Sequence, residues 1–196
     1  MANLVFKYGV MRSGKSTHLL QNAFNYDSND MGVLVVKPKI DTKGNDKVVS
    51  RIGVNRKVDL LLNKDDNLFE IVKDNYQDVR CILIDEAQFL ERPQVDQCMD
   101  IVTILDIPVV CYGLRTDFQT NLFPGSERLL AIANSLEEME TICSCGNNAI
   151  FVGRYVNGEF QIEGSQVAID GKDNVIYKSM CAKCYGKAKM KLLRNK

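Results

Sequence analysis

The residue pattern best suited to chemistry lies close to the amino terminus. It matches G-x-x-x-x-G-K-[ST] without a gap and runs through Gly9, Val10, Met11, Arg12, Ser13, Gly14, Lys15 and Ser16. Glycines let the backbone curl so that successive N–H groups point at phosphate oxygens. The pattern predicts a phosphate-binding loop. In it, Lys15 would reach the β- and γ-phosphates of a nucleoside triphosphate, and the Ser16 hydroxyl would ligate Mg²⁺.

A second chemical pattern combines an apolar run with two carboxylates. Residues 82–84 are Ile-Leu-Ile and lead directly into Asp85 and Glu86, as in a Walker B strand. We expect Asp85 to hold Mg²⁺, directly or through a water molecule, and Glu86 to act as a general base toward an attacking hydroxyl. Some ATPases carry the same pair and activate water with it, so the two patterns leave the phosphoryl acceptor open.

Four of the seven cysteines form two close pairs, one C-x-C and one C-x-x-C. Two such pairs that bracket a loop predict a tetrahedral Cys₄ zinc site, which is structural because four thiolates leave no open position for substrate or water. Its ligands would be Cys143, Cys145, Cys181 and Cys184. The remaining cysteines fall in predicted core elements and are expected to be small buried residues: Cys81, Cys98 and Cys111.

These side chains need elements to position them, and four short apolar runs are candidates for strands. They are rich in Val, Ile and Leu without strict alternation, which is typical of strands buried on both faces of a parallel sheet. The runs cover residues 4–8, 33–36, 81–84 and 107–112. Helices are expected at residues 16–26, 65–76, 93–105 and 126–136. The alternation predicts an α/β fold class, a P-loop (RecA-like) parallel sheet flanked by helices.

The alternation stops near Glu138. Beyond it the chain carries the cysteine pairs, frequent glycines and short alternating runs such as residues 149–152. This change predicts a small β-rich, zinc-binding lasso domain. The expected organisation is a P-loop core at residues 1–138, the lasso domain at residues 139–190 and a flexible carboxy-terminal tail at residues 191–196.

Composition argues against several classes of protein. The 196 residues include 25 basic and 25 acidic side chains, so the net charge is zero, whereas dedicated nucleic-acid binders carry a basic excess. No apolar run approaches the roughly 20 residues needed to span a bilayer, and the first apolar run is too short for a signal peptide. We expect a cytoplasmic protein with no nucleic-acid or membrane partner, whose cysteines serve as metal ligands or buried thiols.

Four further segments together carry a family resemblance. Residues 85–89, DEAQF, resemble the D-E-[AC]-Q-F signature of the type II thymidine kinase family, in its bacterial branch. Residues 111–118, CYGLRTDF, resemble that family's C-Y-G-L-x-T-D-F stretch. Residues 37–43 and 50–53 resemble its K-P-x-I-D-x-R and S-R-x-G segments. The segments keep their order, and the resemblance extends from about residue 3 to residue 186.

The resemblance implies a reaction. The chain would transfer the γ-phosphoryl group of ATP to the 5′-hydroxyl of thymidine, and of deoxyuridine as well, giving the monophosphate in nucleotide salvage. Glu86 would deprotonate the hydroxyl, and Thr17 and Gln88 would join the residues that bind ATP and Mg²⁺. Structural zinc would anchor a lasso loop over the nucleoside. The resemblance also implies a homotetramer that is inhibited by its end product, thymidine triphosphate.

The resemblance further implies a nucleoside pocket. Met11 and Phe118 would lie beside the base, with Phe118 stacking on it, while Tyr177 would close over the nucleoside and Val152 would lie near the thymine methyl group. Backbone groups of a short segment would bind the thymine edge: Gln166, Val167, Ala168, Ile169 and Asp170. From residue type alone, the aromatic residues could equally be core residues.

Two alternatives remain at this point. A nucleoside monophosphate kinase would need an arginine-rich lid, but Arg154 is the only arginine in the lasso. A zinc-ribbon nucleic-acid binder would need a basic surface, which the charge balance does not favour.

Overall fold

The computed structural model describes residues 1–41, 44–166 and 174–194. Its main sheet has six strands in the order β5-β2-β6-β7-β1-β8, and all neighbouring strands in it are parallel. In that order the strands are Leu60–Leu62, Gly32–Pro38, Val79–Ile84, Val109–Gly113, Leu4–Tyr8 and Ser135–Glu138. The predicted α/β class is confirmed, and the four predicted strands are β1, β2, β6 and β7.

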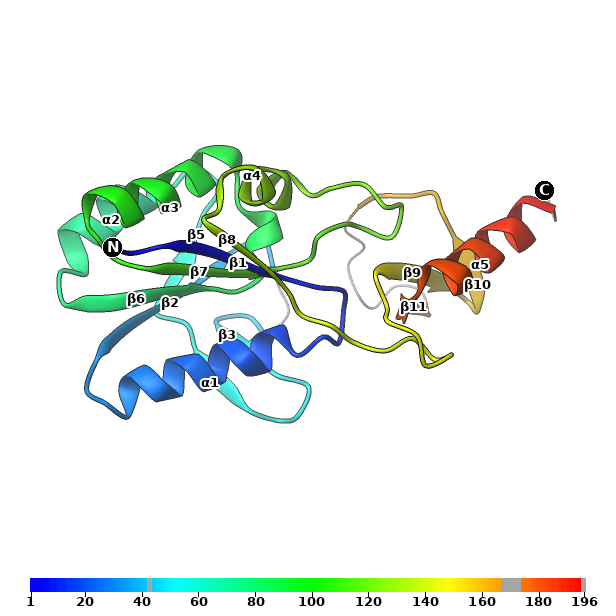
Figure 1. The fold of residues 1–196 in the computed structure, drawn as a ribbon, viewed down its shortest axis with the longest axis horizontal. Coiled ribbons are helices and arrows are strands. Elements are labelled where there is room, and N and C mark those ends of the chain that lie inside the picture. The colour runs from blue at the N-terminus through cyan, green and yellow to red at the C-terminus, as the bar shows by residue number, and fades with distance from the viewer. Residues whose placement is uncertain (42–43, 167–173, 195–196) are drawn as a thin grey trace.

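Helices cover both faces of this sheet (Figure 1). Helix α1, Lys15–Asp27, lies on one face. Helices α2, α3 and α4 lie on the other and span Leu68–Asn75, Arg92–Ile104 and Pro124–Ile132. The strands lack simple alternation because both faces are buried. In β2, for example, Leu34 and Val36 pack in the cluster that includes α2, α3 and α4, whereas Val33 and Val35 pack in the cluster that includes α1.

The last helix and the last strand of the core differ from the prediction. The helix expected at residues 126–136 ends at Ile132, and Ser135–Glu138 instead forms β8. The reason is a pair of hydrogen bonds that holds Asn134 against β1: its backbone N–H donates to the Leu4 carbonyl, and its side-chain oxygen accepts from the Leu4 N–H. These bonds set the parallel register of an edge strand whose own sequence carries little strand signal.

A hairpin that the strand patterns did not predict lies beside α1. Its strands are β3, Lys47–Val49, and β4, Asn55–Lys57, which pair antiparallel. The turn between them reaches the amino-terminal end of α1, where it becomes part of the site described below.

The region after β8 is β-rich, as expected. Its sheet is antiparallel in the order β10-β9-β11, formed by Glu159–Gln161, Phe151–Val156 and Val175–Met180. Helix α5, Ala182–Arg194, follows, and the whole region lies beyond one end of the main sheet (Figure 1). Residues 191–194, which were expected in a flexible tail, continue α5, because a run of good helix formers follows Gly186 without a break.

Candidate active site

The phosphate-binding loop joins β1 to α1. Its backbone requires glycine at two positions: a Cβ on Gly9 would lie 2.5 Å from the Met139 carbonyl oxygen, and Gly14 has a φ of 83° directly before the helix. The Lys15 ammonium lies over the loop and donates to the carbonyl oxygen of Val10 at 2.8 Å. The curled loop and the amino terminus of α1 therefore direct N–H groups and a cation into one space.

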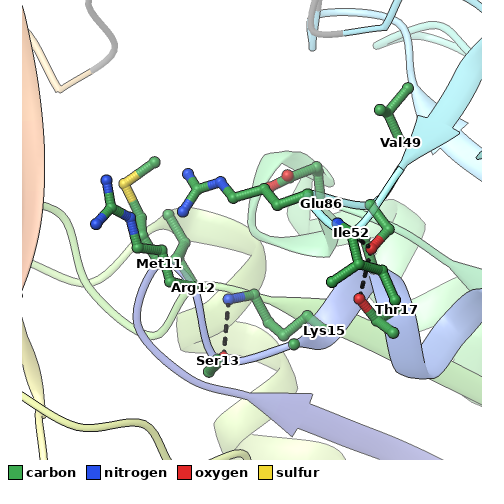
Figure 2. A pocket seen from close by; sticks show the side chains of 13 residues that line it. Met11, Arg12, Ser13, Lys15, Thr17, Val49, Ile52 and Glu86 are labelled. Carbon is green, nitrogen blue, oxygen red and sulfur yellow. Dashed lines mark hydrogen bonds between the residues drawn. The ribbon is translucent and has the colours of Figure 1, made fainter. Parts of the chain in front are cut away.

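A cavity of about 270 Å³ lies against this loop (Figure 2). Residues 11–17 form one wall, and the turn between β3 and β4, residues 49–52, forms another. A 2.6 Å hydrogen bond between the hydroxyls of Thr17 and Ser50 joins the two walls. The S-R-x-G segment was noted in the sequence only as a resemblance, and the fold now gives it a place beside the phosphate-binding loop.

The predicted magnesium ligands lie together where β6 ends and α1 begins. The Ser16 hydroxyl donates to Asp85 Oδ2 at 3.5 Å, and Asp85 is buried. Burial, followed by the neighbouring Glu86 carboxylate, raises the pKa of Asp85 to about 7, and the charge of Lys15 opposes this rise. A hydroxyl and a buried carboxyl group beside the loop fit Mg²⁺, which prefers oxygen ligands and would favour the ionised carboxylate.

Glu86 is held in an uncommon backbone conformation between β6 and the short helix η1, Ala87–Phe89. Its φ and ψ are 51° and 39°, in the left-handed region that few residues other than glycine adopt. The Gln88 amide donates to Glu86 Oε2 at 2.6 Å and accepts from the Leu114 N–H at 3.0 Å. Gly113 allows this approach, because a Cβ there would lie 2.9 Å from Gln88 Oε1. Gln88 thus fixes the direction of the Glu86 carboxylate.

A second cavity, of about 150 Å³, meets the first one. The two share Met11, Glu86 and Leu114 among their lining residues, so Glu86 lies at their junction. Gln88, which was expected among the ATP and Mg²⁺ ligands, lines the second cavity and does not line the first. The geometry suits transfer of a group from a ligand in one cavity to a ligand in the other, with a carboxylate at the junction.

The second cavity brings together the predicted nucleoside residues that the structure describes. They are Met11, Phe118, Val152, Gln166 and Tyr177. The remaining predicted positions, residues 167–170, lie outside the described residues. The cavity also has lining residues that the sequence analysis did not propose: Asp41, Phe89, Leu114, Thr116, Asp117 and Phe123. All except Phe123 fall within segments that carry the family resemblance, so their positions in those segments were the available signal.

The four paired cysteines converge as the spacing predicts. Their sulfur atoms all lie within 4.8 Å of one another, and tetrahedral zinc with Zn–S bonds of about 2.3 Å needs sulfur separations of about 3.8 Å. Hydrogen bonds lower the pKa of Cys145 to about 6, first the one from the Asn147 backbone N–H and then the one from its side chain. The Cys184 N–H points at Cys181 Sγ, 3.5 Å away. The cluster therefore fits a structural zinc ion bound by thiolates.

Residues assigned to the core lie where they were expected. Cys81, Cys98 and Cys111 are buried within the main sheet and its helices. The only histidine, His18, is hydrogen-bonded through Nδ1 to the Tyr112 hydroxyl at 2.9 Å and lines neither of the two cavities described above.

Comparison with known proteins identifies the family of this chain. The family model described as thymidine kinase matches residues 2–185. A thymidine kinase from Mannheimia succiniciproducens is 49% identical over 185 residues, which is 92% of this chain and 93% of the relative. The chain belongs to the thymidine kinase family. The resemblance inferred from the sequence segments is thereby confirmed.

Other thymidine kinases agree over the same span. The protein from Haemophilus influenzae (strain ATCC 51907 / DSM 11121 / KW20 / Rd) is 49% identical over 185 residues, covering 92% of this chain and 94% of the relative. The thymidine kinase of Enterobacteria phage T4 is 42% identical over 196 residues, covering 98% of this chain and all of that relative. As a member of a kinase family, the chain is a phosphotransferase. In the parts of the chain that the structure describes, no helix is long and apolar enough to cross a membrane.

Proposed function

We propose that this chain is an ATP-dependent thymidine kinase that transfers the γ-phosphoryl group of ATP to the 5′-hydroxyl of thymidine, giving thymidine monophosphate. One observation carries this proposal: two cavities, one on the phosphate-binding loop and one lined by aromatic side chains, meet at the Glu86 carboxylate. Membership of the thymidine kinase family supports thymidine as the acceptor.

ATP with Mg²⁺ would occupy the larger cavity. The N–H groups of the loop would hold the phosphates, and Lys15 would leave its contact with the Val10 carbonyl to reach the β- and γ-phosphates. Ser16 and Asp85 would hold the metal ion. Such a site works mainly by positioning the reactants and by stabilising charge on the transferred group.

Thymidine would occupy the smaller cavity. The base would stack on Phe118, the methyl group would contact the buried Val152, and Tyr177 would cover the nucleoside. The backbone of residues 166–170 remains the predicted partner of the thymine edge. Deoxyuridine lacks only the methyl group that Val152 would contact. We therefore expect it to be accepted more weakly, by at most about tenfold, since one methyl group contributes about 1 kcal/mol.

Glu86 would be the general base. Its carboxylate would take the proton of the 5′-hydroxyl as the oxygen attacks the γ-phosphorus, and the bond to the β-phosphate oxygen would break. The hydrogen bond from Gln88 leaves the second Glu86 oxygen for the substrate hydroxyl and keeps the carboxylate at the junction of the two cavities.

The remaining expectations concern the lasso domain and the assembly. A structural zinc ion in the cysteine cluster would fix both ends of the lasso, residues 146–180, so that less entropy is lost when the loop orders over thymidine. The end of β8 at Glu138 supports the proposed boundary between the core and this domain. A homotetramer, inhibition by thymidine triphosphate and a cytoplasmic location remain predictions from the family resemblance.

The direct test is transfer of labelled γ-phosphate from ATP to a panel of nucleosides. We expect thymidine to be labelled at its 5′-oxygen by the wild-type protein and by Glu127→Gln, a control that removes an exposed carboxylate in the first turn of α4. Glu86→Gln should lower kcat by about 10² to 10⁴, the usual contribution of a general base. Hydrolysis of ATP without labelling of thymidine would overturn the proposed acceptor.

A further inference from the structure

Helix α5 contacts Phe118, a lining residue of the aromatic cavity, through one buried side chain. Tyr185 directly follows Cys184, one of the four clustered cysteines. Its hydroxyl donates a 2.6 Å hydrogen bond to the backbone carbonyl of Phe118, a residue 67 positions away in the sequence. Phe118 is almost fully buried and lines the second cavity. A single hydrogen bond therefore joins the helix at the cysteine cluster to the proposed base-stacking residue.

The Tyr185 ring has little freedom to move. It lies between Phe151 and Phe160, with ring centroids 5.0 and 5.3 Å away, and its backbone N–H donates to the Cys181 carbonyl at 3.0 Å. The position of the hydroxyl is therefore set by aromatic packing and by the turn that carries Cys181 and Cys184.

The segment that carries the Phe118 carbonyl is also held in place. The Asp117 carboxylate accepts from the N–H groups of Gln119 at 2.8 Å and Asn121 at 2.9 Å, which holds residues 117–121 in a tight turn. Within the described ranges, no backbone N–H reaches the Phe118 carbonyl. The Tyr185 hydroxyl is its hydrogen-bond donor there, so loss of that hydroxyl would leave a buried acceptor unpaired.

The Phe118 ring has a second partner in the same region. The Arg154 guanidinium, on β9, lies 4.9 Å from the centre of the ring. Arg154 Nη1 also donates to the Ser165 carbonyl at 3.4 Å. The region that contains the cysteine cluster therefore holds both the backbone and the ring of Phe118, through Tyr185 and Arg154 respectively.

We propose that Tyr185 is a positioning residue for the nucleoside. It holds Phe118 where the ring can stack on the base, and it links the geometry of the cysteine cluster to the affinity for the nucleoside. This inference rests on the proposed function, since it concerns the same acceptor cavity. The inference requires that loss of the Tyr185 hydroxyl change KM for thymidine and leave KM for ATP unchanged, because Tyr185 does not line the cavity at the phosphate-binding loop.

The test compares Tyr185→Phe with Tyr155→Phe. The first variant keeps the ring and removes only the hydroxyl that bonds Phe118. The second removes a hydroxyl in the same region whose partner is the Met180 sulfur, 3.9 Å away. We expect Tyr185→Phe to raise KM for thymidine about five- to tenfold, as expected for the loss of a buried hydrogen bond. KM for ATP and zinc content should match those of Tyr155→Phe.

A double-mutant cycle with Phe118→Leu shows whether Tyr185 acts through the ring. In the Phe118→Leu background, removing the Tyr185 hydroxyl should change KM for thymidine by less than twofold, because the stacking interaction that it positions is already lost. Equal and additive effects of Tyr185→Phe in both backgrounds would overturn the inference, as would equal thymidine KM values for Tyr185→Phe and Tyr155→Phe. A wild-type protein that does not phosphorylate thymidine would instead refute the proposed function.

Discussion

The P-loop core and the cysteine-bearing region are stabilised in different ways. The core buries strand residues on both faces of a parallel sheet, and side chains such as Phe6 and Ile82 have no exposed surface. The region after Glu138 contributes to two small apolar clusters, one of which joins Cys143 and Cys181 to Val10 of the core. Small domains with so little apolar burial commonly depend on a metal ion. From this difference we expect the core to fold by hydrophobic burial and its neighbour to need its cysteines.

The two regions also contribute unequally to the two cavities. Every lining residue of the cavity on the phosphate-binding loop comes from the core. The aromatic cavity combines core residues with Val152, Gln166 and Tyr177 from the second region. Polar contacts cross the boundary beside it, including the Gln119 amide that donates to the Ile162 carbonyl at 3.0 Å. The core thus forms the cavity on the phosphate-binding loop alone, and the aromatic cavity needs both regions.

The largest difference between the two regions is expected when the proposed zinc ion is lost. In Cys181→Ser, or after treatment with a zinc chelator, we expect residues after Glu138 to become sensitive to protease while the core stays folded. KM for thymidine should rise by at least about 100-fold, since the ordered wall of the cavity is lost. Binding of an ATP analogue should change by less than about threefold. Steady-state kinetics, calorimetry and limited proteolysis measure these outcomes, and Cys98→Ala is the control for loss of a thiol elsewhere. An equal loss of affinity for thymidine and for the ATP analogue would contradict the conclusion that only the aromatic cavity depends on the second region.

A change inside the core should affect the chemical step more than either affinity. A Cβ at Gly113 would lie 2.9 Å from Gln88 Oε1 and 3.0 Å from the Gln88 backbone nitrogen. We expect Gly113→Ala to displace the Gln88 amide and with it the Glu86 carboxylate, so that kcat falls about 10- to 100-fold. Steady-state kinetics should show both KM values within about threefold of the wild type, with zinc content unchanged. A normal kcat would show that Gln88 does not orient the base.

The smallest effect is expected from a glycine in α5. Gly186 lies within the helix, and nothing lies within 4 Å of a Cβ placed there. Gly186→Ala should stabilise the helix by about 0.5–1 kcal/mol, because alanine loses less backbone entropy than glycine. Hydrogen exchange in α5 should slow by about threefold while exchange in β1 and β6 stays unchanged. Equal slowing in both regions would mean that they unfold as one unit.

The sequence predicted the elements with strong local patterns. The strands around Leu4, Leu34, Ile82 and Val109 were identified because buried parallel strands are continuous apolar runs. It missed β8, whose four residues Ser-Leu-Glu-Glu join the sheet through contacts with β1. Short edge strands depend on their neighbours more than on their own propensity.

For the site, the sequence predicted which residues carry chemistry. The phosphate-binding loop, the carboxylate pair and the cysteine pairs are local patterns, since each requires a fixed spacing along a short stretch of chain. Only the tertiary structure decided that the turn after β3 joins the phosphate-binding loop and that Tyr185 bonds Phe118. Such contacts join residues far apart in the chain. They depend on where packing places whole helices and strands, and a local pattern in one sequence does not predict which distant residues come into contact.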